Sequence, residues 1–253
     1  MYYKTKQRSE KDMIFGTRSV IEALDAGKEI DKIFVRRDIN SELSRELFAA
    51  LRGREIPVQK VPIEKLNRFT QKNHQGVVAF ISPVAYQRIE DIVPQIFEEG
   101  RVPFIVALDS VTDVRNFGAI ARTCECAGVD AIVVQSRNAA NLNGDAVKTS
   151  AGALLKIPVC REPNLYRALK FMQESGLKLV AATEDAEKNY TNVDFSVPVV
   201  LVMGAEDEGI MRDNLVICDE EAAIPMLGTI ESLNVSVAAG VLMYEVVRQR
   251  ITM

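Results

Sequence analysis

The 253-residue sequence has no tryptophan, a single histidine and only four cysteines. The cysteines form no C-x-x-C pair, and the single histidine is accompanied by no second cluster of ligands, so we expect reduced thiols and no metal. No apolar run reaches the roughly 18 residues of a membrane span, which argues against a membrane partner. The first residues, MYYKTKQRSEKD, lack the hydrophobic segment of a secretory signal. These absences predict a cytoplasmic protein.

Charge is distributed unevenly along a chain whose formal net charge is −4. Residues 1–82 contain 16 basic and 11 acidic side chains, a balance of +5, so the remainder carries −9. A basic N-terminal part in an acidic chain favours a polyanionic partner for that part. Each basic side chain is equally well explained as a solvated surface charge. The candidates for contact with a polyanion are Arg18, Arg36, Arg37, Lys60, Arg68 and Lys72.

Two α/β parts joined by a linker are predicted. Residues 12–82 alternate short strands with amphipathic helices, one of which, TRSVIEALDAG, can take Thr17 as its N-cap. Residues 83–100 contain two prolines and no clean period, which indicates a linker holding a short helix. Residues 101–253 alternate helices with continuously apolar strands, a pattern typical of a parallel sheet covered on both faces. The predicted strands of this part are PFIVALD, AIVVQ, KIPVC, LKLVAAT, VPVVLVM and AAIPM.

Three segments of the second part place polar side chains after predicted strands, where open parallel sheets bind ligands. In LDSVTDVRNFGAIARTCECAG, a helix is expected to start after Asn116 and to carry Arg122 about two turns later. Helix capping by Asn116 and an ion pair of Arg122 with Glu125 are an alternative account. In VVLVMGAEDEG, acids follow Gly204, which suits a cationic ligand or a polarised hydroxyl better than a phosphate. Alternatively, one of these carboxylates caps a helix beginning near Ile210.

A third segment, SLNVSVAAGVLMYEVVRQR, joins a polar start to an apolar helix. The residues from Asn234 to Val247 are apolar or small on nearly all sides, which predicts burial between the core and another subunit. The preceding cluster of Glu231, Ser232 and Asn234, continued by Ser236, offers more polar groups than one cap requires. Free backbone N–H groups at such a helix start attract a carboxylate or a phosphate.

In this order and spacing, the three segments resemble the signature motifs of the SpoU (TrmH-like) ribose methyltransferases of the SPOUT superfamily. In addition, FGTRSVIEAL and HQGVVA resemble the small substrate-binding domain of the RlmB-type ribosomal RNA enzymes, so the resemblance covers almost the whole chain. One departure is Val114, since the family usually has proline there (D-P-x-N). The matching residues are Asn116, Gly118 and Arg122, then Gly204, Glu206 and Gly209, then IPM and SLNVSVAAG.

The resemblance implies a parallel-sheet catalytic domain with a deep trefoil knot, preceded by a small α/β (L30e-like) RNA-binding domain. It implies a homodimer that transfers a methyl group from S-adenosylmethionine to the ribose 2′-hydroxyl of a guanosine in large-subunit ribosomal RNA, without a metal. The residues that it assigns to catalysis are Arg122, Asn116, Glu206, Ser232 and Asn234. Those that it assigns to the cofactor, through backbone groups, are Gly204, Ile224 and Leu233.

Arginine stays protonated in proteins, so we expect Arg122 to stabilise a developing alkoxide and to bind the adjacent phosphate. Asn116 and Glu206 are expected to position Arg122 and the ribose, and Ser232 and Asn234 to order the floor of the site. Two alternatives stay open: transfer RNA as the substrate, and a non-catalytic RNA-binding assembly factor. A nicotinamide-dependent enzyme is disfavoured because no G-x-G-x-x-G fingerprint is present.

Overall fold

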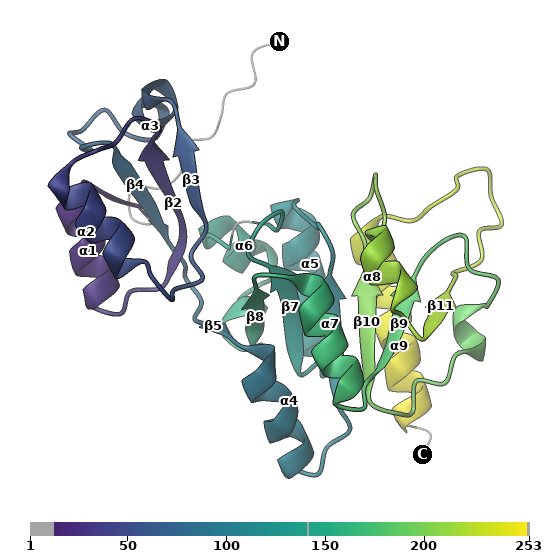
Figure 1. The fold of residues 1–253 in the computed structure, drawn as a ribbon. Coiled ribbons are helices and arrows are strands. Elements are labelled where there is room, and N and C mark those ends of the chain that lie inside the picture. Colours follow the sequence, from purple (N-terminus) through teal and green to yellow (C-terminus); the bar gives the residue numbers. More distant parts are fainter. Residues whose placement is uncertain (1–12, 141, 252–253) are drawn as a thin grey trace. The chain divides into compact units, whose positions relative to one another are not determined.

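The computed structural model describes residues 13–140 and 142–251, which form two units (Figure 1). The division lies between Ala85 and Tyr86, and residues 142–144 group with the first unit. The predicted domain limits at residues 12 and 253 lie outside the described residues. Within the described ranges, no helix is long and apolar enough to cross a membrane, and no group of three His, Cys, Asp or Glu side chains is placed to hold a metal ion.

The first unit is a four-stranded sheet with helices on both faces. In sheet order its strands are β1 (Met13–Phe15), β4 (Val77–Ile81), β2 (Ile30–Arg36) and β3 (Val58–Val61). Its helices are α1 (Thr17–Asp25), α2 (Glu42–Ala50) and α3 (Ile63–Phe69). Successive residues of a strand point to opposite faces. Accordingly, Ile33 and Val35 are buried with α1 and α2, whereas Phe34 is buried with α3.

Two of the quoted motifs of the first unit, FGTRSVIEAL and HQGVVA, meet at the start of α1. The N-cap is Gly16, with φ +89°, and not Thr17 as predicted. The backbone N–H of Thr17 donates to the side-chain oxygen of Gln75 (3.2 Å), and that of Gly16 donates to the carbonyl of Val77 (3.0 Å). The prediction failed because a side chain 58 residues away, and not a local one, satisfies the start of this helix.

His74 has a structural role in the loop before β4. Its Nδ1 accepts from the backbone N–H of Gly76 (3.0 Å), so Nε2 carries the proton and donates to Oδ1 of Asn67 (2.9 Å). Burial and the nearby Arg36 lower the pKa of His74 below its ordinary value of 6.5. The imidazole is therefore neutral at physiological pH and is not a surface cation.

The second unit is a seven-stranded parallel sheet, which confirms the predicted fold class. In sheet order its strands are β11 (Glu220–Ala222), β9 (Lys178–Ala182), β10 (Val199–Met203), β6 (Phe104–Leu108), β7 (Ala131–Gln135), β8 (Val159–Glu162) and β5 (Tyr86–Gln87). Its helices are α4 (Ile89–Glu98), α5 (Val114–Cys126), α6 (Gly144–Thr149), α7 (Leu165–Glu174), α8 (Arg212–Val216) and α9 (Val235–Ile251). The central strands β6 and β10 are buried along their whole length because helices cover both faces.

Two predicted strands lie a few residues from their observed positions. KIPVC starts at Lys156, whereas β8 starts at Val159, and AAIPM ends at Met226, whereas β11 ends at Ala222. In both cases a proline stands outside the observed strand, and proline has no N–H to donate to a sheet.

Most of residues 83–100, predicted as a linker, belongs to the second unit. Strand β5 pairs with β8, with Tyr86 opposite Val159. One face of α4 is buried in the core of this unit, starting with Ile89. Pro94 lies inside α4 and weakened the helical signal in the sequence.

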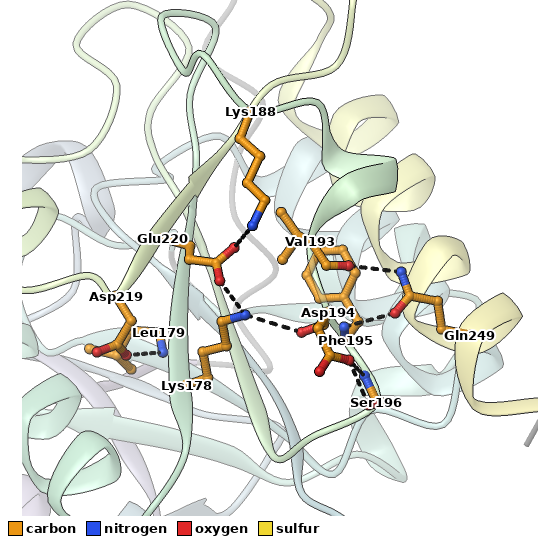
Figure 2. A network of polar contacts seen from close by, with 10 residues as sticks. All are labelled: Lys178, Leu179, Lys188, Val193, Asp194, Phe195, Ser196, Asp219, Glu220 and Gln249. Carbon is orange, nitrogen blue, oxygen red and sulfur yellow. Dashed lines mark hydrogen bonds and ion pairs between the residues drawn. The ribbon is translucent and has the colours of Figure 1, made fainter.

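The C-terminal end of α9 is held by polar contacts, shown in part in Figure 2. Gln249 accepts from the backbone N–H of Phe195 (2.8 Å) and donates to the carbonyl of Val193 (2.9 Å). Arg250 donates to four backbone carbonyls at 2.8–3.1 Å, in the segments that precede β6 and β10. Figure 2 also shows Glu220 paired with two lysines. The contacts of Gln249 and Arg250 fix α9 along the sheet, where it also packs on α5.

Candidate active site

The three polar segments leave the sheet from one row of strand ends. Met203 of β10 lies opposite Leu108 of β6 on one side and Ala182 of β9 on the other. Ala182 in turn lies opposite Ala222 of β11. Because all of these strands are parallel, the segments after β6, β10 and β11 begin at the same edge of the sheet.

The first segment forms the start of α5. The N-cap is Asp113, whose Oδ1 accepts from the backbone N–H groups of Arg115 (2.8 Å) and Asn116 (2.9 Å). Asn116 is therefore the third helical residue and not the cap that the sequence allowed, which leaves its side chain available to other segments. Val114 is the first helical residue, where the N–H needs no helical partner, so the helix can start with valine in place of the usual proline.

Asn116, Glu206 and Asn234, one from each segment, form a hydrogen-bonded trio. Nδ2 of Asn116 donates to Oε1 of Glu206 (3.0 Å). Nδ2 of Asn234 donates to Oδ1 of Asn116 (3.1 Å) and also to Oε1 of Glu206. Residues 90 and 118 positions from Asn116 are thus joined directly to it.

The orientation of the Asn234 amide is set by helix α9. Its Oδ1 accepts from the backbone N–H of Ser236 (3.0 Å) and from the hydroxyl of Ser236 (2.5 Å). A side-chain oxygen that satisfies the first turn of a helix is a typical cap. With the oxygen engaged there, the amide nitrogen must face Glu206 and Asn116. Part of the polar cluster in the sequence therefore caps α9 and part of it joins the trio.

The loop after β10 folds back on itself at Gly204. Ala205 and Gly209 exchange two backbone hydrogen bonds of 3.0 Å each. A Cβ on Gly204 would lie 2.1 Å from the carbonyl carbon of Gly209, which no side chain tolerates. Glycine is therefore required here by close backbone approach.

Asp109, which the sequence did not single out, supports the segment that follows the Glu206 loop. It is fully buried at the end of β6, and its Oδ2 accepts from the backbone N–H of Met211 (2.8 Å) and the side chain of Asn214 (2.8 Å). The predicted capping of this helix by an acid of the Glu206 loop is wrong, because α8 begins at Arg212 after the N-cap Met211 and no side chain of the described residues caps it. The available signal was an acid that directly follows an entirely apolar strand.

A cavity of about 650 Å³ opens between the second and third segments. Its volume is typical of small-molecule sites, which are largely apolar with a few placed polar groups. Several carboxylates at its rim favour a ligand of positive charge. The sequence-predicted residues that line it are Gly204, Glu206, Ile224, Ser232, Leu233 and Asn234.

Arg122 and Ser232 are not joined to the trio. Arg122 is exposed on α5, and its side chain makes no hydrogen bond or ion pair with any residue that the structure describes. Glu125, its alternative partner in the sequence, pairs with Lys156 (3.2 Å). Ser232 lines the cavity, but its hydroxyl bonds to no side chain among the described residues.

The six basic candidates of the first unit do not form one cluster. Arg18 pairs with two glutamates at 3.5–3.6 Å on the side of α1 and α2. Arg36 pairs with Asp38 (2.7 Å). Arg68 lies on α3, on the opposite face of the sheet from α1. The others, all exposed, are Arg37, Lys60 and Lys72.

Comparison with known families matches both units. The SpoU rRNA Methylase family matches residues 103–244, and the RNA 2′-O ribose methyltransferase substrate binding family matches residues 13–87. A TrmH family tRNA/rRNA methyltransferase of Bacillus subtilis is 35% identical over 95% of this chain and 97% of its own length.

Two solved structures are similar in fold and sequence. An S-adenosylmethionine-bound rRNA methyltransferase from Sinorhizobium meliloti is 28% identical, with a TM-score of 0.60, over 94% of this chain and 87% of that one. A TrmH/SpoU tRNA modifying enzyme from A. aeolicus is 30% identical, with a TM-score of 0.54, over 65% of this chain and 85% of that one. The chain therefore belongs to the SpoU family of RNA 2′-O-ribose methyltransferases, which take the methyl group from S-adenosylmethionine.

Proposed function

We propose that the enzyme methylates the ribose 2′-hydroxyl of a guanosine in large-subunit ribosomal RNA. The observation that supports this most is the match of residues 13–87, in the first unit, to the substrate-binding family. The related rRNA enzyme aligns with nearly the whole chain, whereas the tRNA enzyme aligns with about two thirds of it. The excess of basic over acidic residues in residues 1–82 supports binding of this part of the chain to RNA phosphates.

The cavity beside Glu206 fits the methyl donor. When bound, S-adenosylmethionine supplies a methyl group activated on a positively charged sulfur. Ile224 and Leu233 offer apolar surface for an adenine ring, and the loop at Gly204 offers backbone groups at close approach. The acidic rim suits the positive charge of the donor. These three residues are our candidates for holding it.

Positioning of the ribose is assigned to the trio and to Arg122. Orienting two reactants in line supplies several kcal/mol toward a barrier, at most roughly 7–11. Asn234 lines the cavity and is bonded to Asn116, and the amides of both are fixed, which suits them to orient the ribose. Arg122 is exposed on the same helix as Asn116, which suits it to bind a phosphate and to stabilise charge on the reacting oxygen. Ser232 remains a candidate for ordering the cavity floor.

We also propose a homodimer formed through α9. One face of this helix is buried in the core through Ala239, Leu242 and Met243. The other face exposes Val237 (51% accessible) and Tyr244 (52%), spaced seven residues apart. An apolar stripe left on an otherwise core-packed helix is suited to a second copy of the chain. Val237→Glu is expected to convert a dimer to a monomer in sedimentation analysis, and a monomeric wild-type protein would contradict this proposal.

The test of substrate is transfer of labelled methyl from S-adenosylmethionine to protein-free large-subunit ribosomal RNA and, separately, to bulk transfer RNA. We expect label in the ribosomal RNA, loss of it in Arg122→Ala, and its retention in Arg167→Ala, an exposed arginine on α7. Label only in transfer RNA would keep the chemistry and overturn the substrate. Binding of S-adenosylmethionine without transfer to either RNA would indicate a precursor particle as the substrate.

A further inference from the structure

We propose that Glu206 is the proton acceptor for the reacting 2′-hydroxyl. The inference deepens the proposed function and rests on it. The two oxygens of this carboxylate have different surroundings. Oε1 accepts from the side-chain amides of both Asn116 and Asn234. Oε2 accepts no hydrogen bond from any residue in the described part of the chain, and the side chain is exposed.

Two N–H donors on one oxygen hold the carboxylate in one orientation. The donors are themselves fixed, since Oδ1 of Asn234 is engaged by Ser236 and Asn116 sits in the first turn of α5. Glu206 also lines the cavity that fits the methyl donor. Its open oxygen therefore stands at the boundary between that cavity and solvent, where an RNA ribose must approach.

The neighbouring groups are less suited to accept the proton. Arg122 stays protonated, and the side-chain amides of asparagine are not bases. Asp109 is buried, with its Oδ2 already accepting two hydrogen bonds. The other five acids that line the cavity have no side-chain hydrogen bond or ion pair within the described residues, so nothing holds them in one geometry. These acids are Glu184, Asp185, Asp207, Glu208 and Glu231.

The step balances without a further reactant. The O–H bond of the ribose breaks and its proton passes to Oε2 of Glu206. The freed electron pair of the oxygen forms the new bond to the methyl carbon, and the carbon–sulfur pair stays on sulfur, which becomes neutral. The positive charge of Arg122 stabilises the negative charge that develops on the oxygen while the proton leaves, so arginine need not act as a base.

Glu206→Gln separates proton acceptance from positioning. The amide oxygen of glutamine can accept the same two hydrogen bonds from Asn116 and Asn234, but its NH₂ group, in place of Oε2, cannot take a proton. The matched control is Asp213→Asn, which removes the same charge from an exposed position on α8 outside the cavity. Single-turnover methyl transfer is measured with S-adenosylmethionine affinity by calorimetry and RNA affinity by filter binding.

We expect Glu206→Gln to slow methyl transfer by about 10²–10⁴-fold, the usual contribution of a general base, with both affinities within about twofold of wild type. Asp213→Asn should keep the wild-type rate. A Glu206→Gln enzyme within tenfold of wild type would overturn the proposal. So would a loss of rate matched by loss of cofactor or RNA affinity, which would make Glu206 a positioning residue. Absence of transfer by the wild type itself would instead contradict the proposed function, and the inference with it.

Discussion

Gly204→Ala tests whether the closed loop after β10 builds the cofactor cavity. A Cβ at this position would lie 2.1 Å from the carbonyl carbon of Gly209 and 2.3 Å from the nitrogen of Ile210. Both are backbone atoms, so no side-chain rotation relieves the clash and the two strands of the loop must separate by about 1 Å or more. Separation breaks the two hydrogen bonds between Ala205 and Gly209.

The size of the effect follows from those two hydrogen bonds. Each contributes about 0.5–1.5 kcal/mol net, so the open loop costs about 1–3 kcal/mol. If the cavity requires the closed loop, S-adenosylmethionine should bind about 5- to 150-fold more weakly. Titration calorimetry measures this affinity, and circular dichroism confirms that the variant is folded.

Gly228→Ala is the matched control for Gly204→Ala. A Cβ on Gly228 would meet nothing within 4 Å, and its φ lies outside the left-handed range. This variant should bind the cofactor as the wild type does. A folded Gly204→Ala protein with affinity within twofold of wild type would refute the claim that the closed loop forms the site.

Three further predictions concern groups that hold the fold. Asp109→Ala leaves the Met211 N–H and the Asn214 amide without their buried acceptor. Urea denaturation should show that the free energy of unfolding falls by roughly 2–6 kcal/mol, and a fall of less than about 1 kcal/mol would contradict the assigned role. The pKa of His74 is lowered in the fold, mainly by burial, so the neutral imidazole stabilises the protein above pH 6.5 and this contribution is lost as the pH falls below that value. The melting temperature should therefore fall between pH 7.5 and pH 5.5. The fall should be less steep in His74→Asn. An equal fall in both proteins would exclude His74 as the cause. Arg250→Met keeps the apolar stem but removes the donors to four carbonyls. Thermal melting should show that the free energy of unfolding falls by about 1–3 kcal/mol, and an unchanged melting temperature would contradict the role of Arg250 in holding α9.

Continuous apolar runs predicted the central strands, because a strand buried on both faces needs no polar alternation. AIVVQ matches β7 residue for residue, and the helix IEKLNRF matches α3. Local capping was less predictable. Asp113 and Asn116 are both good N-cap residues, and only the structure shows that the aspartate caps α5. Start signals of this kind compete whenever two polar residues stand within one turn.

Long-range contacts account for what the sequence did not predict. Asp109 accepts hydrogen bonds from residues 102 and 105 positions away, and the periodicity of a sequence does not predict such a pairing. Strand ends predicted a shared edge for the three segments, but the pairing of the trio's side chains, which span more than a hundred residues, was not predicted. The trefoil knot is implied by the same resemblance and stays a prediction, because nothing in the apolar pattern indicates how the chain threads.

The central claim is that the three segments assemble a site for methylating a ribose oxygen of RNA. The most direct test maps the methyl group after incubation of the enzyme with labelled S-adenosylmethionine and ribosomal RNA. Alkaline hydrolysis followed by chromatography should release the label in a dinucleotide, since a methylated 2′-oxygen cannot attack the neighbouring phosphate. Label released in mononucleotides, with the methyl group on a base, would contradict the account.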